Sequence, residues 1–225
     1  MAGDWYDFRV SAHNVHGWSV VSALKSIQAA QAPDSPAAAT TTIVDKSIRI
    51  YWTQPSWNFK TITAYQVLIQ DHLGSTFSEE LTHCDGSTSG ILTSLYCDIP
   101  VSVLRSSPFN LILADPVVAK VRAYNERGWS SYSTLNVDPN IAYIQTEPGT
   151  MNTPQRGSST SIDRIEVTWA ALASPNNGNS PITTYALYWD AGTGGTSWTD
   201  LAGLDSDYLS TSFLVTTGIT MGQTY

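Results

Sequence analysis

Val10-Ser-Ala-His-Asn-Val-His-Gly-Trp-Ser19 recurs further along the chain as Val121-Arg-Ala-Tyr-Asn-Glu-Arg-Gly-Trp-Ser130. Val, Ala, Asn, Gly, Trp and Ser occupy the same places in both stretches, at a spacing of 111 residues from Gly17 to Gly128. A period of this length exceeds the roughly 20–50 residues of solenoid repeats. It suits a domain that folds around its own core, so the sequence predicts a tandem array of similar domains.

Two further pairs of segments extend the match outward from this stretch. Ile48-Arg-Ile-Tyr-Trp52 corresponds to Ile165-Glu-Val-Thr-Trp169, 117 residues later, and Ile62-Thr-Ala-Tyr65 corresponds to Ile182-Thr-Thr-Tyr185, 120 residues later. The segments keep their order while the spacing grows. The later copy is therefore expected to have longer loops on the same arrangement of elements.

The pattern inside each copy is that of short β-strands. Residues 47–53 and 162–169 alternate between apolar and polar side chains, which is the period of a strand with one buried face. Segments rich in Pro or Gly separate these runs, and no window has sustained helical spacing. We therefore expect an all-β chain built of Greek-key β-sandwiches.

These features resemble the fibronectin type III family. The resemblance rests on a Trp in the second strand, a Tyr that opens the third, and the sixth strand with its following turn: Trp52, Trp169, Tyr65, Tyr185 and residues 6–19. It covers nearly the whole chain and implies tandem Ig-like sandwiches. The middle copy is most similar to the Cys-containing domains of large secreted or surface proteins of single-celled eukaryotes. It departs from the family at the tyrosine corner, where Tyr6 of the first copy is replaced by Val117.

The resemblance also divides the chain, with its ends falling inside domains. Residues 1–31 correspond to the last two strands, F and G, of one repeat, and residues 32–145 to a complete domain. Residues 146–225 correspond to a domain without its last two strands, and Tyr225 aligns with Tyr6. Three explanations are open: a slice of a longer continuous polypeptide, a subunit that exchanges strands with its neighbour, or a fragment without a biological boundary.

The N-terminal strand carries the residues that a neighbouring domain would need. A sandwich without F and G leaves strand C with an unpaired edge, and alternate apolar side chains of residues 5–12 would fill it. We assign the inter-unit contacts to Trp5, Tyr6, Phe8, Val10 and Ala12. Burying the larger of these side chains would contribute about 1.5–3 kcal/mol each, before ordering costs. Strand addition of this kind is head to tail and generates an open filament or array.

Cys84 and Cys97 are the only cysteines, and Gly, Ser and Thr are abundant between them. We expect a disulfide, which would stabilise the fold by about 3 kcal/mol in the chain-entropy model and implies an oxidising compartment. Two free thiols are the alternative. A metal site that includes His83 lacks the further ligands that zinc requires.

Exposed aromatic residues and threonines suggest further roles. Trp18 and Trp129 hold matching positions after the turn, and we expect them to contact the adjacent repeat; stacking on a sugar ring is the alternative. Sequons for N-glycosylation are absent from the sequence. Thr40, Thr41 and Thr42 follow an alanine-rich stretch and are the candidates for O-glycosylation.

Composition and motifs exclude several functions. The chain has 19 acidic and 11 basic residues, a net charge of −8, and so lacks the positive face that binding to nucleic acid requires. No apolar run approaches the roughly 20 residues that span a bilayer. Nucleophile elbows, zinc-protease motifs and phosphate-binding loops are also missing from the sequence. We expect neither catalysis nor a cofactor or metal.

The sequence therefore predicts an extracellular or cell-surface structural protein. Its domains would form the repeating unit of a fibre or surface filament, in which the N-terminal strands complete the C-terminal domain of the neighbouring unit. The partner would be the chain itself, as a head-to-tail homopolymer or a continuous tandem array. The alternative is an adhesion or carbohydrate-binding module of a large surface protein, with glycans as partners.

Overall fold

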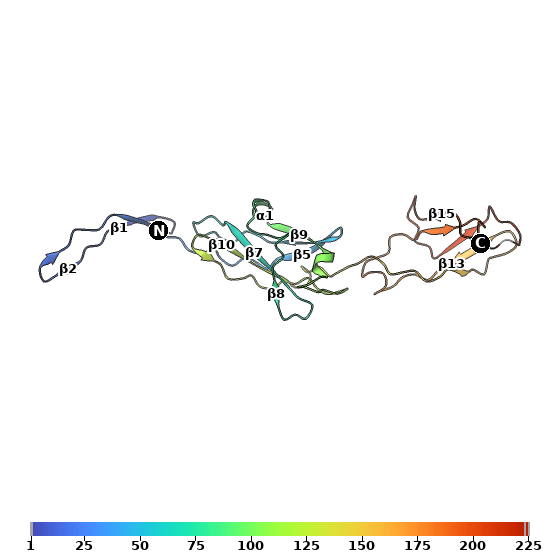
Figure 1. The fold of residues 1–225 in the computed structure, drawn as a ribbon, viewed down its shortest axis with the longest axis horizontal. Coiled ribbons are helices and arrows are strands. Elements are labelled where there is room, and N and C mark those ends of the chain that lie inside the picture. Colours follow the sequence, from blue (N-terminus) through green and yellow to red (C-terminus); the bar gives the residue numbers. More distant parts are fainter. Residues whose placement is uncertain (1, 223, 225) are drawn as a thin grey trace. The chain divides into compact units, whose positions relative to one another are not determined.

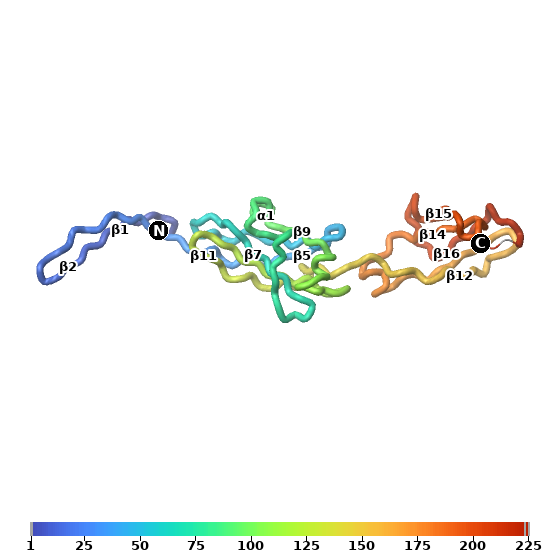
Figure 2. Tube along the Cα trace, in the orientation of Figure 1, coloured from blue at the N-terminus to red at the C-terminus, as the bar shows by residue number. Residues whose placement is uncertain are grey.

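The computed structural model describes residues 2–222 and 224, and the chain separates into two compact units, Met1–Ile144 and Gln145–Tyr225. Both units are built of antiparallel β-sheets, so the chain is all-β, as predicted (Figure 1). The path of each unit can be followed along the tube in Figure 2.

The first unit begins with a long hairpin. β1 (Trp5–Phe8) pairs with β4 (Lys25–Gln28), and nearer the turn β2 (His13–Asn14) pairs with β3 (Gly17–Trp18). We call residues 3–29 the donor hairpin. Its turn is closed by the backbone of Gly17, whose φ of 130° is in a region open mainly to glycine.

A two-sheet sandwich makes up the rest of the first unit. The first sheet has the order β5 (Thr40–Val44), β6 (Ser47–Tyr51), β9 (Tyr96–Pro100). The second has the order β11 (Gly128–Trp129), β10 (Ala119–Asn125), β7 (Ala64–Gln70), β8 (Phe77–Ser78). In the lettering of the Ig and fibronectin type III folds these sheets are A-B-E and G-F-C-C′. The sandwich is thus Ig/fibronectin type III-like.

The core of this sandwich follows from the alternation in its strands. Ile48 and Ile50 of β6 face Val67 and Val121 of the second sheet, and all four are buried. Trp52 packs on Tyr65, with their ring centroids 5.4 Å apart. Polar residues alternate with these on the outer faces, where Arg49 and Asp98 form an ion pair of 2.7 Å.

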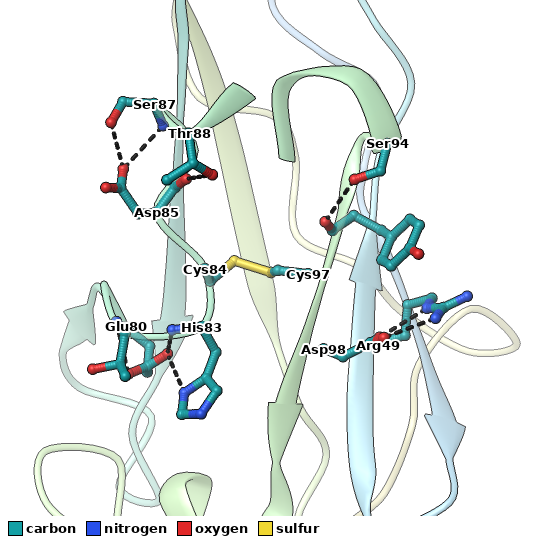
Figure 3. Close-up of a disulfide and its surroundings, with 12 residues drawn as sticks. Arg49, Glu80, His83, Cys84, Asp85, Ser87, Thr88, Ser94, Cys97 and Asp98 are labelled. Carbon is teal, nitrogen blue, oxygen red and sulfur yellow. Dashed lines mark hydrogen bonds and ion pairs between the residues drawn. A yellow bond between two sulfur atoms is a disulfide. The ribbon is translucent and has the colours of Figure 1, made fainter. Parts of the chain in front are cut away.

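The disulfide joins Cys84 to Cys97 of β9 and lies in the core (Figure 3). The segment between the two cysteines is rich in Gly, Ser and Thr but is not loop throughout. It contains α1 (Ser89–Ser94), whose Thr93 hydroxyl donates to the Ser89 carbonyl. A second short helix, α2 (Val101–Leu104), follows β9 directly. Both are too short to show the helical spacing that a sequence window detects.

The described residues of the second unit form five strands in two sheets. The larger sheet has the order β12 (Gln155–Arg156), β13 (Ile165–Thr168), β16 (Ser212–Val215), and the smaller pairs β14 (Leu187–Trp189) with β15 (Thr199–Ala202). These are the places of strands A, B, E and of C, C′. Tyr225 lies outside the described residues.

Candidate assembly site: an exposed strand face and an open sheet

The donor hairpin has the same internal bonds as the F–G hairpin of the sandwich. In the donor hairpin the Ala12 amide donates to Ser19 Oγ at 3.0 Å, and the Val10 amide donates to Ser22 Oγ at 3.1 Å. In the sandwich the Ala123 amide donates to Ser130 Oγ and the Val121 amide donates to Ser133 Oγ, both at 3.0 Å. Each of these donor-hairpin residues stands 111 positions before its counterpart in the sandwich. The repeated sequence therefore corresponds to a repeated hairpin geometry.

The faces of the two hairpins differ sharply in exposure. In the sandwich, alternate residues of β10 (strand F) and of the segment just before it are fully buried: Val117, Ala119, Val121 and Ala123. The corresponding residues of the donor hairpin are Tyr6, Phe8, Val10 and Ala12. Phe8 is 54% exposed and Val10 is 71% exposed. These two side chains, with Tyr6 on the same strand face, form an exposed apolar strip that no second sheet of the described chain covers. Trp5 points to the opposite face, where the Lys60 ammonium lies 5.3 Å from its ring centre.

The second unit has the complementary feature, an open interior. A groove of about 480 Å³ is lined from both of its sheets, by residues that include Ile165, Val167, Leu187 and Val215. A second groove of about 290 Å³ lies beside Trp169 and Leu187. Ile165, Val167 and Leu187 are only half-buried. Their counterparts in the sandwich are buried: Ile48, Ile50 and Val67.

The edge of the smaller sheet is also open. β14 pairs with β15 on one side, and within residues 145–222 and 224 no strand pairs with its other side. In the sandwich, the equivalent side of β7 is occupied by β10, with Val121 opposite Val67. An edge of this kind offers unpaired backbone groups to an incoming strand.

Trp129 packs on its own sheet. Its ring lies 4.9 Å from that of Tyr124, and the Arg122 guanidinium lies 4.5 Å from its centre. Arg122 and Lys120 continue a row of alternating cations and rings that includes Tyr132. We did not predict this row from the sequence, although Lys120 and Arg122 are alternate basic residues on the outward face of one strand.

Trp18 is 71% exposed and contacts only the His13 ring among the described aromatic pairs, at 4.8 Å. The contact with an adjacent repeat that we expected for Trp18 and Trp129 stays a prediction.

Thr40, Thr41 and Thr42 belong to strand β5, so their side chains differ in exposure and in their suitability for O-glycosylation. Thr41 is buried; its hydroxyl donates to the Val117 carbonyl and accepts from the Ala142 amide at 2.8 Å. A glycan would replace the hydrogen that this hydroxyl donates, and the buried oxygen leaves no space for a sugar, so the expectation is wrong for Thr41. Thr40 is half-buried and Thr42 is exposed, and both stay candidates.

Carboxylates near the disulfide and the β7–β8 turn serve local structure. Burial alone would raise the pKa of Glu80, but the amides of His83 and Thr82 donate to it and hold its pKa below the usual value (Figure 3). The amide and hydroxyl of Thr76, joined by those of Ser75, lower the pKa of Asp71 to about 2.

The described residues contain neither a metal-binding cluster nor a membrane-spanning helix. Residues 2–222 and 224 contain no group of three His, Cys, Asp or Glu side chains that could hold a metal ion. No helix in the same residues has the length and apolar character to cross a membrane.

No family model and no curated protein matches the sequence. Among solved structures, the chain is similar to titin domains, with 19% identity and a TM-score of 0.39 over 63% of this chain and 40% of that one. It is also similar to the FN1–FN3 domains of chicken CNTN1, with 14% identity and a TM-score of 0.36 over 83% of this chain and 56% of that one. The chain thus spans less than two thirds of either structure.

Proposed function

We propose that the chain is an extracellular structural protein, the repeating unit of a fibre or surface filament. In this proposal the donor hairpin of one unit supplies strands F and G to the C-terminal sandwich of the next. The observation that carries it is the exposure of Phe8 and Val10, whose counterparts Ala119 and Val121 are fully buried. The buried disulfide fits an extracellular domain, because such bonds persist in oxidising compartments.

The geometry of the sandwich supplies the register of the proposed contact. β10 pairs with β7 so that Val121 lies opposite Val67 and Arg122 lies opposite Gln66. Residues of the donor hairpin stand 111 positions before their counterparts in β10, and residues of β14 stand 120 positions after their counterparts in β7. The same pairing between the donor hairpin and β14 would therefore put Val10 opposite Leu187 and Ser11 opposite Ala186. Val10 would then face the groove of about 480 Å³, which Leu187 lines.

A cross-linking experiment tests this register. Chains carrying Ser11→Cys are mixed with chains carrying Ala186→Cys, so that only a bond between two molecules can form. Opposed residues of antiparallel strands have Cα atoms about 4.5–5.5 Å apart, within the range of a disulfide. We expect a dimer on a non-reducing gel.

The matched control is Tyr188→Cys, two residues further along the same outer face. Its Cα would lie about 7–8 Å from that of Ser11, so we expect little dimer. Equal yields from both pairs, or no dimer from either, would contradict the proposal. The mass of the native polypeptide under reducing, denaturing conditions then distinguishes strand exchange, near 24.4 kDa, from a much larger continuous array.

An adhesion or carbohydrate-binding module is the second candidate, because the Trp18 ring is 71% exposed. Exposed tryptophan faces can stack on other rings and apolar surfaces. A glycan array gives the test: binding that Trp18→Ala removes, without a change in thermal stability, would favour this candidate. Absence of glycan binding would leave the structural role.

A further inference from the structure

Asn125 fastens the F–G turn of the sandwich to the segments around it. Its side chain is fully buried, and Nδ2 lies 3.0, 3.1 and 3.3 Å from the carbonyl oxygens of Gln31, Trp57 and Lys60. Its Oδ1 accepts from the Arg127 amide at 2.8 Å. One amide thus connects the turn with the segment before β5 and with the loop between β6 and β7.

Asn14 holds the equivalent position in the donor hairpin. Its Oδ1 accepts from the His16 amide at 2.9 Å, which repeats the bond between Asn125 and Arg127. Asn14 is exposed, and none of the hydrogen bonds of the described chain uses its Nδ2. The donor hairpin therefore presents the amide without the carbonyl groups that receive it in the sandwich.

The second unit repeats the loop that supplies two of those carbonyls. In the sandwich, Asn58 and Phe59 are consecutive residues with φ of 50° and 64°. Gly178 and Asn179 stand 120 residues later, with φ of 72° and 58°. Because the backbone makes the same left-handed turn in both loops, the carbonyls of Trp57 and Lys60 correspond to those of Asn177 and Ser180.

The segment before the domain supplies the third carbonyl, and it is repeated too. The Asp34 amide donates to the Ser56 carbonyl at 3.0 Å, and the Gly149 amide donates to the Asn176 carbonyl at 2.8 Å. The two donors, Asp34 and Gly149, are 115 residues apart, and at the same spacing Gln31 corresponds to Thr146. Among the hydrogen bonds of the described residues, none has the carbonyl of Thr146, Asn177 or Ser180 as its acceptor.

We infer that Asn14 is the residue that sets the register between two copies of this chain. Its side-chain amide donates to the carbonyl oxygens of Thr146, Asn177 and Ser180 in the second copy. The inference rests on the proposed function and adds a recognition residue to that interface. A strand slipped by two residues would still bury apolar side chains, but it would leave the amide and these carbonyls unpaired, which disfavours the wrong register.

The test uses the full chain with Asn14→Asp. The aspartate keeps an acceptor for the His16 amide but replaces the donor with a carboxylate that faces three carbonyl oxygens. We expect association, measured by sedimentation velocity over a concentration series, to weaken about tenfold or more. The control is Asn140→Asp, which makes the same change of charge at another exposed residue and should leave association unchanged.

A second measurement does not depend on a variant. In the unsubstituted chain, the side-chain amide resonances of Asn14 should shift as the chain associates. The inference would be overturned if Asn14→Asp associated like the unsubstituted chain and the Asn14 resonances did not shift. Cross-linking between Ser11→Cys and Ala186→Cys would still support the proposed function in that case. Failure of the unsubstituted chain to associate would overturn the proposed function, and this inference with it.

Discussion

Replacing Phe8 with Ala should weaken assembly without changing the stability of the sandwich, because Phe8 is not part of the sandwich core. Phe8 is 54% exposed in the donor hairpin. If a Phe side chain has about 200 Å² to bury, about 100 Å² of it remains for the partner to cover. At about 25 cal/mol per Å² this area is worth about 2.5 kcal/mol. The association constant should therefore fall about 70-fold.

Sedimentation velocity over a concentration series measures this change, and thermal unfolding of dilute chain measures stability. The matched control is Val15→Ala, because Val15 lies at the turn and is 94% exposed; its counterpart in the sandwich is the exposed Glu126. We expect Val15→Ala to associate like the unsubstituted chain. A similar association constant for Phe8→Ala, or a lower melting temperature of the dilute variant, would refute the reasoning.

Three further predictions concern the sandwich, and thermal unfolding followed by circular dichroism checks each of them. Gly86→Ala should destabilise it, because the new Cβ would lie 2.2 Å from a carbonyl oxygen of β7, whereas Gly90→Ala, with nothing within 4 Å, should not. Reducing the disulfide between Cys84 and Cys97 should cost about 3 kcal/mol, and equal melting with and without reductant would contradict this. Asp71→Asn should lower the melting temperature at pH 7. The folded pKa of Asp71 is lowered to about 2, so its stabilisation is present above the unfolded value of about 3.9 and is lost as the pH falls through 2. A difference in melting temperature as large at pH 2 as at pH 7 would count against this role.

The strands of the sandwich could be predicted because their sequence alternates and one face is buried. Residues 47–51 carry Ile48 and Ile50 toward the core, and both are fully buried. The equivalence of the two hairpins was also visible, since Ser19 and Ser22 bind backbone amides in the way that Ser130 and Ser133 do. When a side chain binds the backbone at a fixed spacing, the same residue type recurs at the same position of each repeat and can be recognised in the sequence.

Other features depend on contacts between distant segments and leave no such trace. Thr41 belongs to an alanine- and threonine-rich stretch, yet its hydroxyl is buried against Ala142, about one hundred residues away in sequence. The carbonyl partners of Asn125 come from two separate segments. Only the folded chain brings these groups together, so the sequence shows that Asn14 is repeated as Asn125 but does not indicate the recognition role that we propose for it.

Hydrogen–deuterium exchange tests most directly whether the donor hairpin completes the C-terminal sandwich. Amide exchange is compared between dilute chain and concentrated chain, because a paired strand exchanges slowly and an exposed one rapidly. The proposal predicts that concentration slows exchange together in residues 6–12 and in residues 185–189. Oligomers that form while both segments exchange as fast as in the dilute chain would contradict the claim.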